Sequence, residues 1–201
     1  MKNLIRVALA VLAIASASVA SAAPVTYAVD PGHSEVGFDV KHFFSKVHGN
    51  FKEFSGTIVF DEADPKNIKV DASAKTASIF TNNERRDGHL RGPDFFAADS
   101  FPTINFKSTS VKADGKGKYK VTGDFTLRGV TKSVTFDGEF LGAGAVAVGG
   151  HSMGTKAGFT ATTVINRKDY GVSWNKTLDQ GGMMLGDEVT ITLAIEANQA
   201  P

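Results

Sequence analysis

The residues best suited to chemistry lie in one short polar segment of the chain. Arg86, His89 and Arg91 occur close together, and Phe95 and Phe96 follow directly after them. Arginine is suited to bidentate recognition of oxyanions. The order of residue types predicts a cationic rim that meets the polar head of an anionic ligand, while the ligand's apolar tail runs past the two phenylalanines. The alternative is that the arginines only hold the local backbone in place.

The spacing of these charges predicts a short helical connector near residues 82–98. Arg86 and His89 are three positions apart, and Asp87 and Arg91 are four apart. Residues at these two spacings share a helix face. We therefore expect an ion pair between Asp87 and Arg91 that locks the helical turn.

His33 is a second candidate for chemistry. It follows the turn formed by residues 30–32 and enters a strand pattern, so a position at the rim is predicted. It could contact a ligand head group or act as a general base. The simpler interpretation is a histidine that holds the turn by hydrogen bonds, because no serine or acid accompanies it at a diagnostic spacing. His33 and His89 are the only candidate bases for an enzymatic alternative.

Other reactive motifs are missing from the sequence. The chain has no cysteine, and its five histidines include no close pair, so no metal site is predicted. There is also no G-x-S-x-G motif, P-loop or dinucleotide fingerprint. The sequence therefore favours a binding protein over an enzyme, with no cofactor other than a bound ligand.

The first 22 residues have the features of a secretory signal peptide. Lys2 and Arg6 precede an apolar run, and Ala20-Ser21-Ala22 supplies small residues for cleavage. The apolar run is shorter than the roughly 20 residues that a membrane-spanning helix needs. We expect cleavage after Ala22, export to the periplasm and no integral membrane segment.

The remaining residues, 23–201, are long enough for one domain with a sizeable core. Removing the two basic residues of the leader changes the net charge from +1 to −1. This near-neutral balance offers no electrostatic footprint for nucleic acid. A homodimer is one candidate assembly.

Apolar and polar residues alternate along most of this domain, as is typical of half-buried strands. Short turns rich in Gly, Pro, Asn or Asp connect the strand patterns, and no helix of crossover length intervenes. The sequence predicts an all-β fold, an antiparallel up-and-down barrel of about eight strands. Closure of the barrel would hide the strand edges.

The predicted inward positions combine large rings with small residues such as Gly123 and Gly138. This combination fits either a packed core or the wall of an apolar tunnel, and periodicity alone favours the packed core. The candidate cavity-wall residues are Phe38, Val40, Phe95, Phe96, Phe106, Phe125, Phe136 and Phe140.

Five segments of the chain carry a family resemblance. They are residues 33–38, 47–56, 86–102, 123–132 and 157–171, of which Arg86-Asp87-Gly88-His89-Leu90-Arg91 with Asp94-Phe95-Phe96 and Phe101-Pro102 is the most specific. In this order they resemble the YceI-like family of secreted bacterial proteins. The resemblance implies an extended antiparallel lipocalin-like barrel around a long hydrophobic pocket that binds polyisoprenoids or other long-chain amphiphiles in the periplasm. It assigns no catalytic residue.

The resemblance favours the tunnel over the packed core, and with it a carrier for a long-chain isoprenoid or similar lipid. Two other classes remain open. One is an enzyme acting on a similar lipid, with His33 or His89 as its base. The other is a stress-related structural protein whose barrel is filled by side chains.

Overall fold

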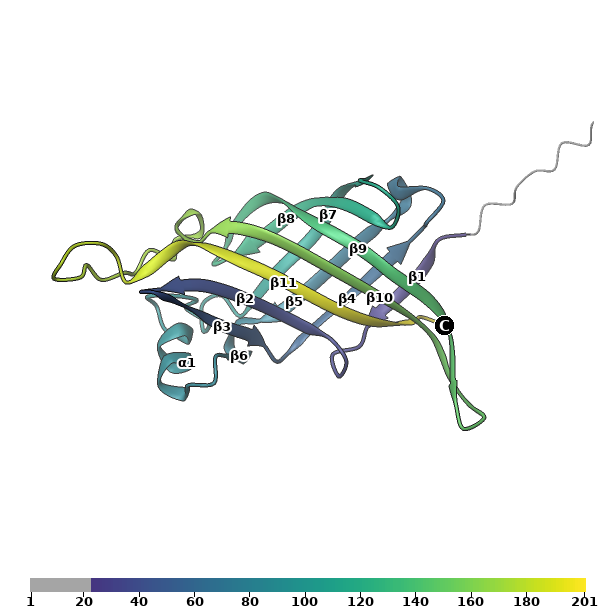
Figure 1. Cartoon of the computed structure of the whole chain (residues 1–201), viewed down its shortest axis with the longest axis horizontal. Coiled ribbons are helices and arrows are strands. Elements are labelled where there is room, and N and C mark those ends of the chain that lie inside the picture. The colour runs from purple at the N-terminus through teal and green to yellow at the C-terminus, as the bar shows by residue number, and fades with distance from the viewer. Residues whose placement is uncertain (1–22) are drawn as a thin grey trace, which may run out of the picture.

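The computed structural model describes residues 23–201, which form a β structure with one short α-helix (Figure 1). The predicted leader, residues 1–22, lies outside this range. Within the range, no helix combines the length and the apolar character needed to cross a membrane. The strands are β1 (Val25–Val29), β2 (Glu35–His42), β3 (Ser45–Phe51), β4 (Phe54–Phe60), β5 (Lys69–Lys75), β6 (Ile79–Phe80), β7 (Thr103–Ala113), β8 (Lys118–Leu127), β9 (Val130–Val148), β10 (His151–Asn166) and β11 (Leu185–Gln199). The helices are α1 (Glu84–Arg91) and the 3-10 turns η1 (Pro65–Asn67), η2 (Thr76–Ser78) and η3 (Arg167–Tyr170).

Eight strands close into a barrel. β1, β4, β5, β7, β8, β9, β10 and β11 are hydrogen bonded in this order, and each pair is antiparallel. The ring closes where β1 pairs with β11, with Tyr27 opposite Gln199. This confirms the predicted antiparallel barrel of about eight strands.

Three further strands extend the barrel wall at one end. β2 pairs with β11, β3 with β2, and β6 with β3. Lys52 and Glu53 separate β3 from β4. The extra strands form the side of the barrel next to α1 (Figure 1).

The two ends of the barrel interior are packed differently. At the end away from α1, the ring of Phe60 lies 4.3 Å from that of Phe140 and 5.8 Å from that of Tyr119, measured between centroids. At the α1 end, a separate cluster of buried residues includes Phe95 and Phe125. Aromatic side chains thus fill much of one end and form a wall at the other.

The helical connector is confirmed at residues 84–91. The side chain of Asn83 caps α1 by accepting a hydrogen bond from the backbone N–H of Arg86 at 3.0 Å. Asp87 is 3% exposed and accepts hydrogen bonds from the backbone N–H of Thr81 at 2.9 Å and from its hydroxyl at 2.5 Å. The expected ion pair between Asp87 and Arg91 is wrong, because Asp87 turns inward and binds the segment before the helix.

Candidate functional site

An apolar cavity of about 580 Å³ lies inside the barrel beside α1. Its walls come from β2, β3, β5, β7, β8, β10, β11, the segment from α1 to Phe96 and the segment from η3 to Trp174. Three exposed residues, Asn83, Arg85 and His89, line it where it meets the solvent. We call this part of the cavity the mouth.

A smaller cavity of about 180 Å³ continues toward the aromatic end of the barrel. The two cavities share Val36, Ala74, Ile104, Phe125 and Ile191 in their linings. The two cavities are therefore neighbouring parts of one apolar interior. The alternative of a barrel filled throughout by side chains is therefore wrong.

All eight residues predicted for the cavity wall line one or both cavities. Phe125 lines both of them. Phe38, Val40, Phe95 and Phe96 line the larger cavity, and Phe106, Phe136 and Phe140 line the smaller one. Strand alternation places the six strand residues inward, since residues two apart in a strand face the same side. Phe95 and Phe96 lie in the turn segment after α1.

The two inward glycines differ in the space beside them. Gly138 lines the smaller cavity, and a Cβ atom there would meet nothing closer than 3.6 Å. A Cβ atom on Gly123 would lie 2.4 Å from the Lys107 carbonyl oxygen and 2.6 Å from the ring of Phe106. The expectation of free space at Gly123 is therefore wrong, because that ring already covers the glycine.

Two of the four predicted rim residues line the larger cavity. They are Arg86 and His89, whose shared helix face points toward it. The guanidinium of Arg86 is engaged, donating from Nε to the Thr81 hydroxyl at 2.7 Å and from Nη2 to the Thr81 carbonyl at 2.6 Å. The ring of His89 packs edge-on against Phe95 and Trp174, and its Nε2 lies 3.0 Å from Asp94 Oδ2.

The other two predicted rim residues, Arg91 and His33, are not in the lining of either cavity. Arg91 donates from Nε to the Ala77 carbonyl at 2.8 Å and from Nη2 to the Ile79 carbonyl at 3.3 Å. These bonds attach the end of α1 to η2 and β6. Arg91 therefore holds the helix in place, which is the alternative that the sequence left open.

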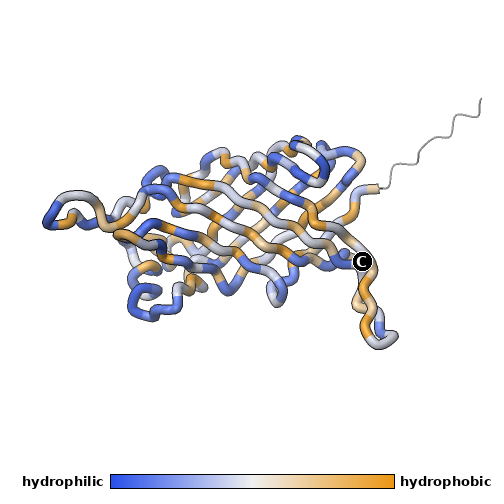
Figure 2. Tube along the Cα trace, viewed as in Figure 1, coloured by the Kyte–Doolittle hydropathy of each residue, from blue (hydrophilic) through white to orange (hydrophobic). Residues whose placement is uncertain are grey.

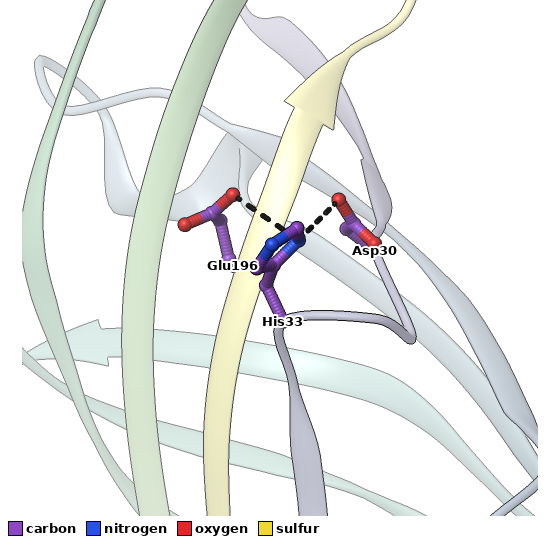
Figure 3. Close-up of side chains that lie close together, drawn as sticks. All are labelled: Asp30, His33 and Glu196. Atoms are coloured by element: carbon purple, nitrogen blue, oxygen red, sulfur yellow. Dashed lines mark hydrogen bonds and ion pairs between the residues drawn. The ribbon is translucent and has the colours of Figure 1, made fainter.

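His33 lies in a charged cluster at the β1–β2 turn (Figure 3). Its Nδ1 is 3.1 Å from Asp30 Oδ2 and 3.9 Å from Glu196 Oε1, and its side chain is 66% exposed. This hydrogen bond, followed by one from the Gly32 N–H, lowers the pKa of Asp30. The geometry is that of a histidine that holds a turn.

Asp30, His33 and Glu196 are also the only group in residues 23–201 whose ligand types and distances could suit a metal ion. Lys156 occupies the same site, because its ammonium is 2.9 Å from Glu196 Oε1 and 3.9 Å from Asp30 Oδ2. A lysine between the two carboxylates neutralises the charge that would attract a cation. The cluster is therefore better described as an ion-pair network.

Arg85 is the charged mouth residue that the sequence did not single out. Its exposed side chain lines the cavity and makes no hydrogen bond or ion pair with any residue between 23 and 201. Its neighbour Arg86 is the same residue type but already donates to Thr81, so the sequence alone does not distinguish the two arginines. Only the helix face and the position of Thr81 distinguish the free guanidinium from the engaged one.

Arg167 also lines the larger cavity, although it is only 4% exposed. It donates to the carbonyls of Gly186, Val172 and Trp174 at 2.7–2.9 Å. Burial lowers the pKa of the Arg167 guanidinium, and the negative charge of Asp187 partly offsets this lowering. Its Nη2 also lies 3.4 Å from Asp187 Oδ1, and Arg167 serves to hold the cavity wall.

Residues 27–197 match the family model described as the YceI-like domain. This chain belongs to the YceI-like family. A UPF0312 protein of Photorhabdus laumondii is 43% identical to this YceI-like chain over 153 residues, covering 75% of this chain and 77% of the relative. A UPF0312 protein of Staphylococcus aureus is 37% identical over 171 residues, covering 85% and 95%.

Solved structures share the same barrel. BcnA of Burkholderia cenocepacia superposes with a TM-score of 0.74 at 26% identity, covering 85% of this chain and 99% of that protein. A YceI protein of Campylobacter jejuni gives 0.66 at 32% identity, covering 86% and 97%. A domain of Saccharophagus degradans described as polyisoprenoid binding and implicated in plant cell wall breakdown gives 0.64 at 14% identity, covering 88% and 99%. At that identity the likeness is one of fold.

Proposed function

We propose that this YceI-like protein binds a long-chain isoprenoid or a similar amphiphilic lipid inside the barrel. The observation that carries the proposal is the apolar cavity of about 580 Å³, which continues into the smaller one and ends at a cationic mouth. Ligand pockets typically measure about 300–1,000 Å³ and combine an apolar lining with a few polar groups. The tail would occupy the two cavities, and the polar head would lie at the mouth.

The energetics favour a ligand with a long apolar chain. Each CH₂ group removed from water contributes about 0.8 kcal/mol, before the cost of ordering the chain. Polar contacts are few, because Arg86 and Arg167 already donate to the protein. Arg85 is the arginine with unused donors at the mouth. The tail would therefore supply most of the affinity, and Arg85 would favour an anionic head.

The comparisons support the choice of an isoprenoid among apolar chains. The family domain covers residues 27–197, and a neighbour of the same fold is described as a polyisoprenoid-binding domain. The predicted leader supports a periplasmic site of action. Together they support a carrier that holds the lipid after export.

The test is the lipid content of protein purified from cells without detergent. We expect mass spectrometry of an organic extract to show an isoprenoid or related long-chain lipid in an amount close to that of the protein. In a matched pair of variants, Gly138→Phe should lower this content because the ring enters the smaller cavity. Gly144→Phe, on the same strand but in open space, should leave it unchanged. An extract without such lipid, together with no uptake of an added prenyl alcohol, would exclude the proposed function.

A further inference from the structure

The turn between β2 and β3 exposes two phenylalanines. Phe43 is 37% exposed and Phe44 is fully exposed. Phe43 also has a φ of 51°, a left-handed conformation that non-glycine residues seldom adopt. Large aromatic side chains contribute to stability mainly by leaving water. This turn therefore presents apolar surface that the described chain does not cover.

The exposed turn belongs to the mouth end of the barrel. The backbone N–H of Phe43 donates to the carbonyl of Met184 at 3.0 Å, and Met184 lines the larger cavity. Met183 beside it is 53% exposed. The inner face of the same hairpin lines the cavity with Val40 and Val47. The β2–β3 turn, α1 and the loop before β11 lie at one end of the molecule (Figure 1).

Two lysines next to this turn lack a counter-charge. Lys41 of β2 lies directly opposite Lys46 of β3, and both are exposed. Like charges at directly opposite positions destabilise a strand pair. Neither lysine forms an ion pair with any residue in the part of the chain that the structure describes. The neighbouring segments 83–89 and 175–184 each contain as many acidic as basic residues, so the lysine pair leaves this end with a positive charge.

We propose that the β2–β3 turn docks the mouth of the barrel on an anionic lipid bilayer. Apolar side chains that enter the headgroup boundary, combined with cations that contact lipid phosphates, are the features of an interfacial membrane anchor. The proposal rests on the proposed function, since a docked mouth lets a lipid pass between the bilayer and the cavity without crossing water.

Phe43 and Phe44 form the exposed tip of the β2–β3 turn. The small size of this tip favours a bilayer over a protein partner. A stable protein interface buries about 1,200–2,000 Å² in total, which a two-residue turn does not provide. A bilayer needs no complementary shape and accepts a small apolar tip. The paired lysines add an attraction that depends on the lipid charge.

The opposite end of the barrel supplies a control surface. The β9–β10 hairpin projects there and is largely hydrophobic (Figure 2). Leu141, Val148 and Met153 on it are exposed, and residues 140–155 contain no Asp, Glu, Lys or Arg. This hairpin matches the tip in apolar character but has no cations within it.

The experiment measures co-sedimentation of the purified protein with vesicles. One set contains phosphatidylglycerol and phosphatidylethanolamine, and the other contains only phosphatidylcholine. We expect binding to the anionic vesicles that weakens with salt and is much lower on the neutral ones. Phe44→Ser should weaken it about tenfold, and the double variant Lys41→Gln/Lys46→Gln roughly thirtyfold. The control Leu141→Ser/Val148→Ser should bind as the wild type does.

Docking by the β2–β3 turn is overturned if Phe44→Ser and Lys41→Gln/Lys46→Gln both bind vesicles as the wild type does. It is also overturned if only the control variant loses binding, or if the protein binds the two vesicle types equally. Lipid extracts of the same preparations separate the two proposals. A protein that carries lipid but ignores vesicles overturns docking and leaves lipid binding intact. A protein that sediments through this turn, but yields no lipid and takes up no added prenyl alcohol, supports docking and overturns lipid binding.

Discussion

Replacing either of two arginines on α1 tests which charge recognises the ligand head. Arg85→Gln removes the free guanidinium at the mouth. Arg91→Gln removes a guanidinium that already donates to the carbonyls of Ala77 and Ile79. The two residues share the same chemistry and the same helix, so the pair of variants separates recognition of a head group from attachment of the helix.

The structure sets the size of each effect. A sheltered hydrogen bond to a charged group contributes about 1.5–3 kcal/mol, but an exposed ion pair contributes about 1 kcal/mol or less. Arg85 is exposed, so its loss should weaken binding of a prenyl phosphate by about 1 kcal/mol, or roughly fivefold. An uncharged prenyl alcohol of equal length should keep its affinity. Arg91→Gln should lower the free energy of unfolding by about 1 kcal/mol, since two carbonyls lose their charged donor.

The assay is displacement of a fluorescent fatty probe by each of the two prenyl ligands, at low and at high salt. Thermal unfolding of each variant is measured in parallel. The decisive quantity is the ratio of the two affinities, because a general loss of folding lowers both alike. A changed ratio in Arg91→Gln with none in Arg85→Gln, or equal losses for both ligands in Arg85→Gln, would refute the assignment of the free charge.

Three further outcomes are expected. Gly123→Ala should destabilise the fold by about 1–3 kcal/mol because the new methyl group meets a carbonyl and a ring, whereas Gly144→Ala should not; chemical denaturation measures both. Hydrogen bonds to the Asp61 carboxylate, first from the Asn67 amide and then from backbone N–H groups, lower its pKa. This contribution to stability is present above about pH 4 and is lost as pH falls through the lowered pKa, so Asp61→Asn should show a smaller loss on acidification in pH-dependent unfolding. Intact-mass measurement of periplasmic protein should give a chain without residues 1–22, and a full-length chain in the membrane fraction would contradict export.

Local pattern was enough to predict the barrel and its inward face. Phe38, Phe106 and Phe136 alternate with polar neighbours, and side chains two apart in a strand face the same side. Turn residues between the strand patterns predicted antiparallel neighbours. Strand alternation and turns depend on residues only a few positions apart, so they can be predicted from the sequence alone. The family resemblance rests on the same local segments.

Free space inside the barrel depends on contacts between distant strands. Gly123 and Gly138 look alike in sequence, yet the ring of Phe106 from β7 covers one and leaves the other open. The register shift between β7 and β8 near Ser108 lies beside this contact. No local pattern specifies where a ring from another strand will lie.

The charged residues of α1 show the same difference between what local sequence predicts and what tertiary contacts decide. The sequence by itself determined that a short helix carries several cations next to Phe95 and Phe96, because charge spacing and capping are local. Only the tertiary structure decided that Arg86 bonds to Thr81, that Arg91 bonds to Ala77, and that Arg85 remains free at the mouth. The physical reason is that a guanidinium is engaged by whichever carbonyls and hydroxyls the folded chain brings within hydrogen-bonding distance, and the positions of those groups are fixed by how the helix packs on η2 and β6.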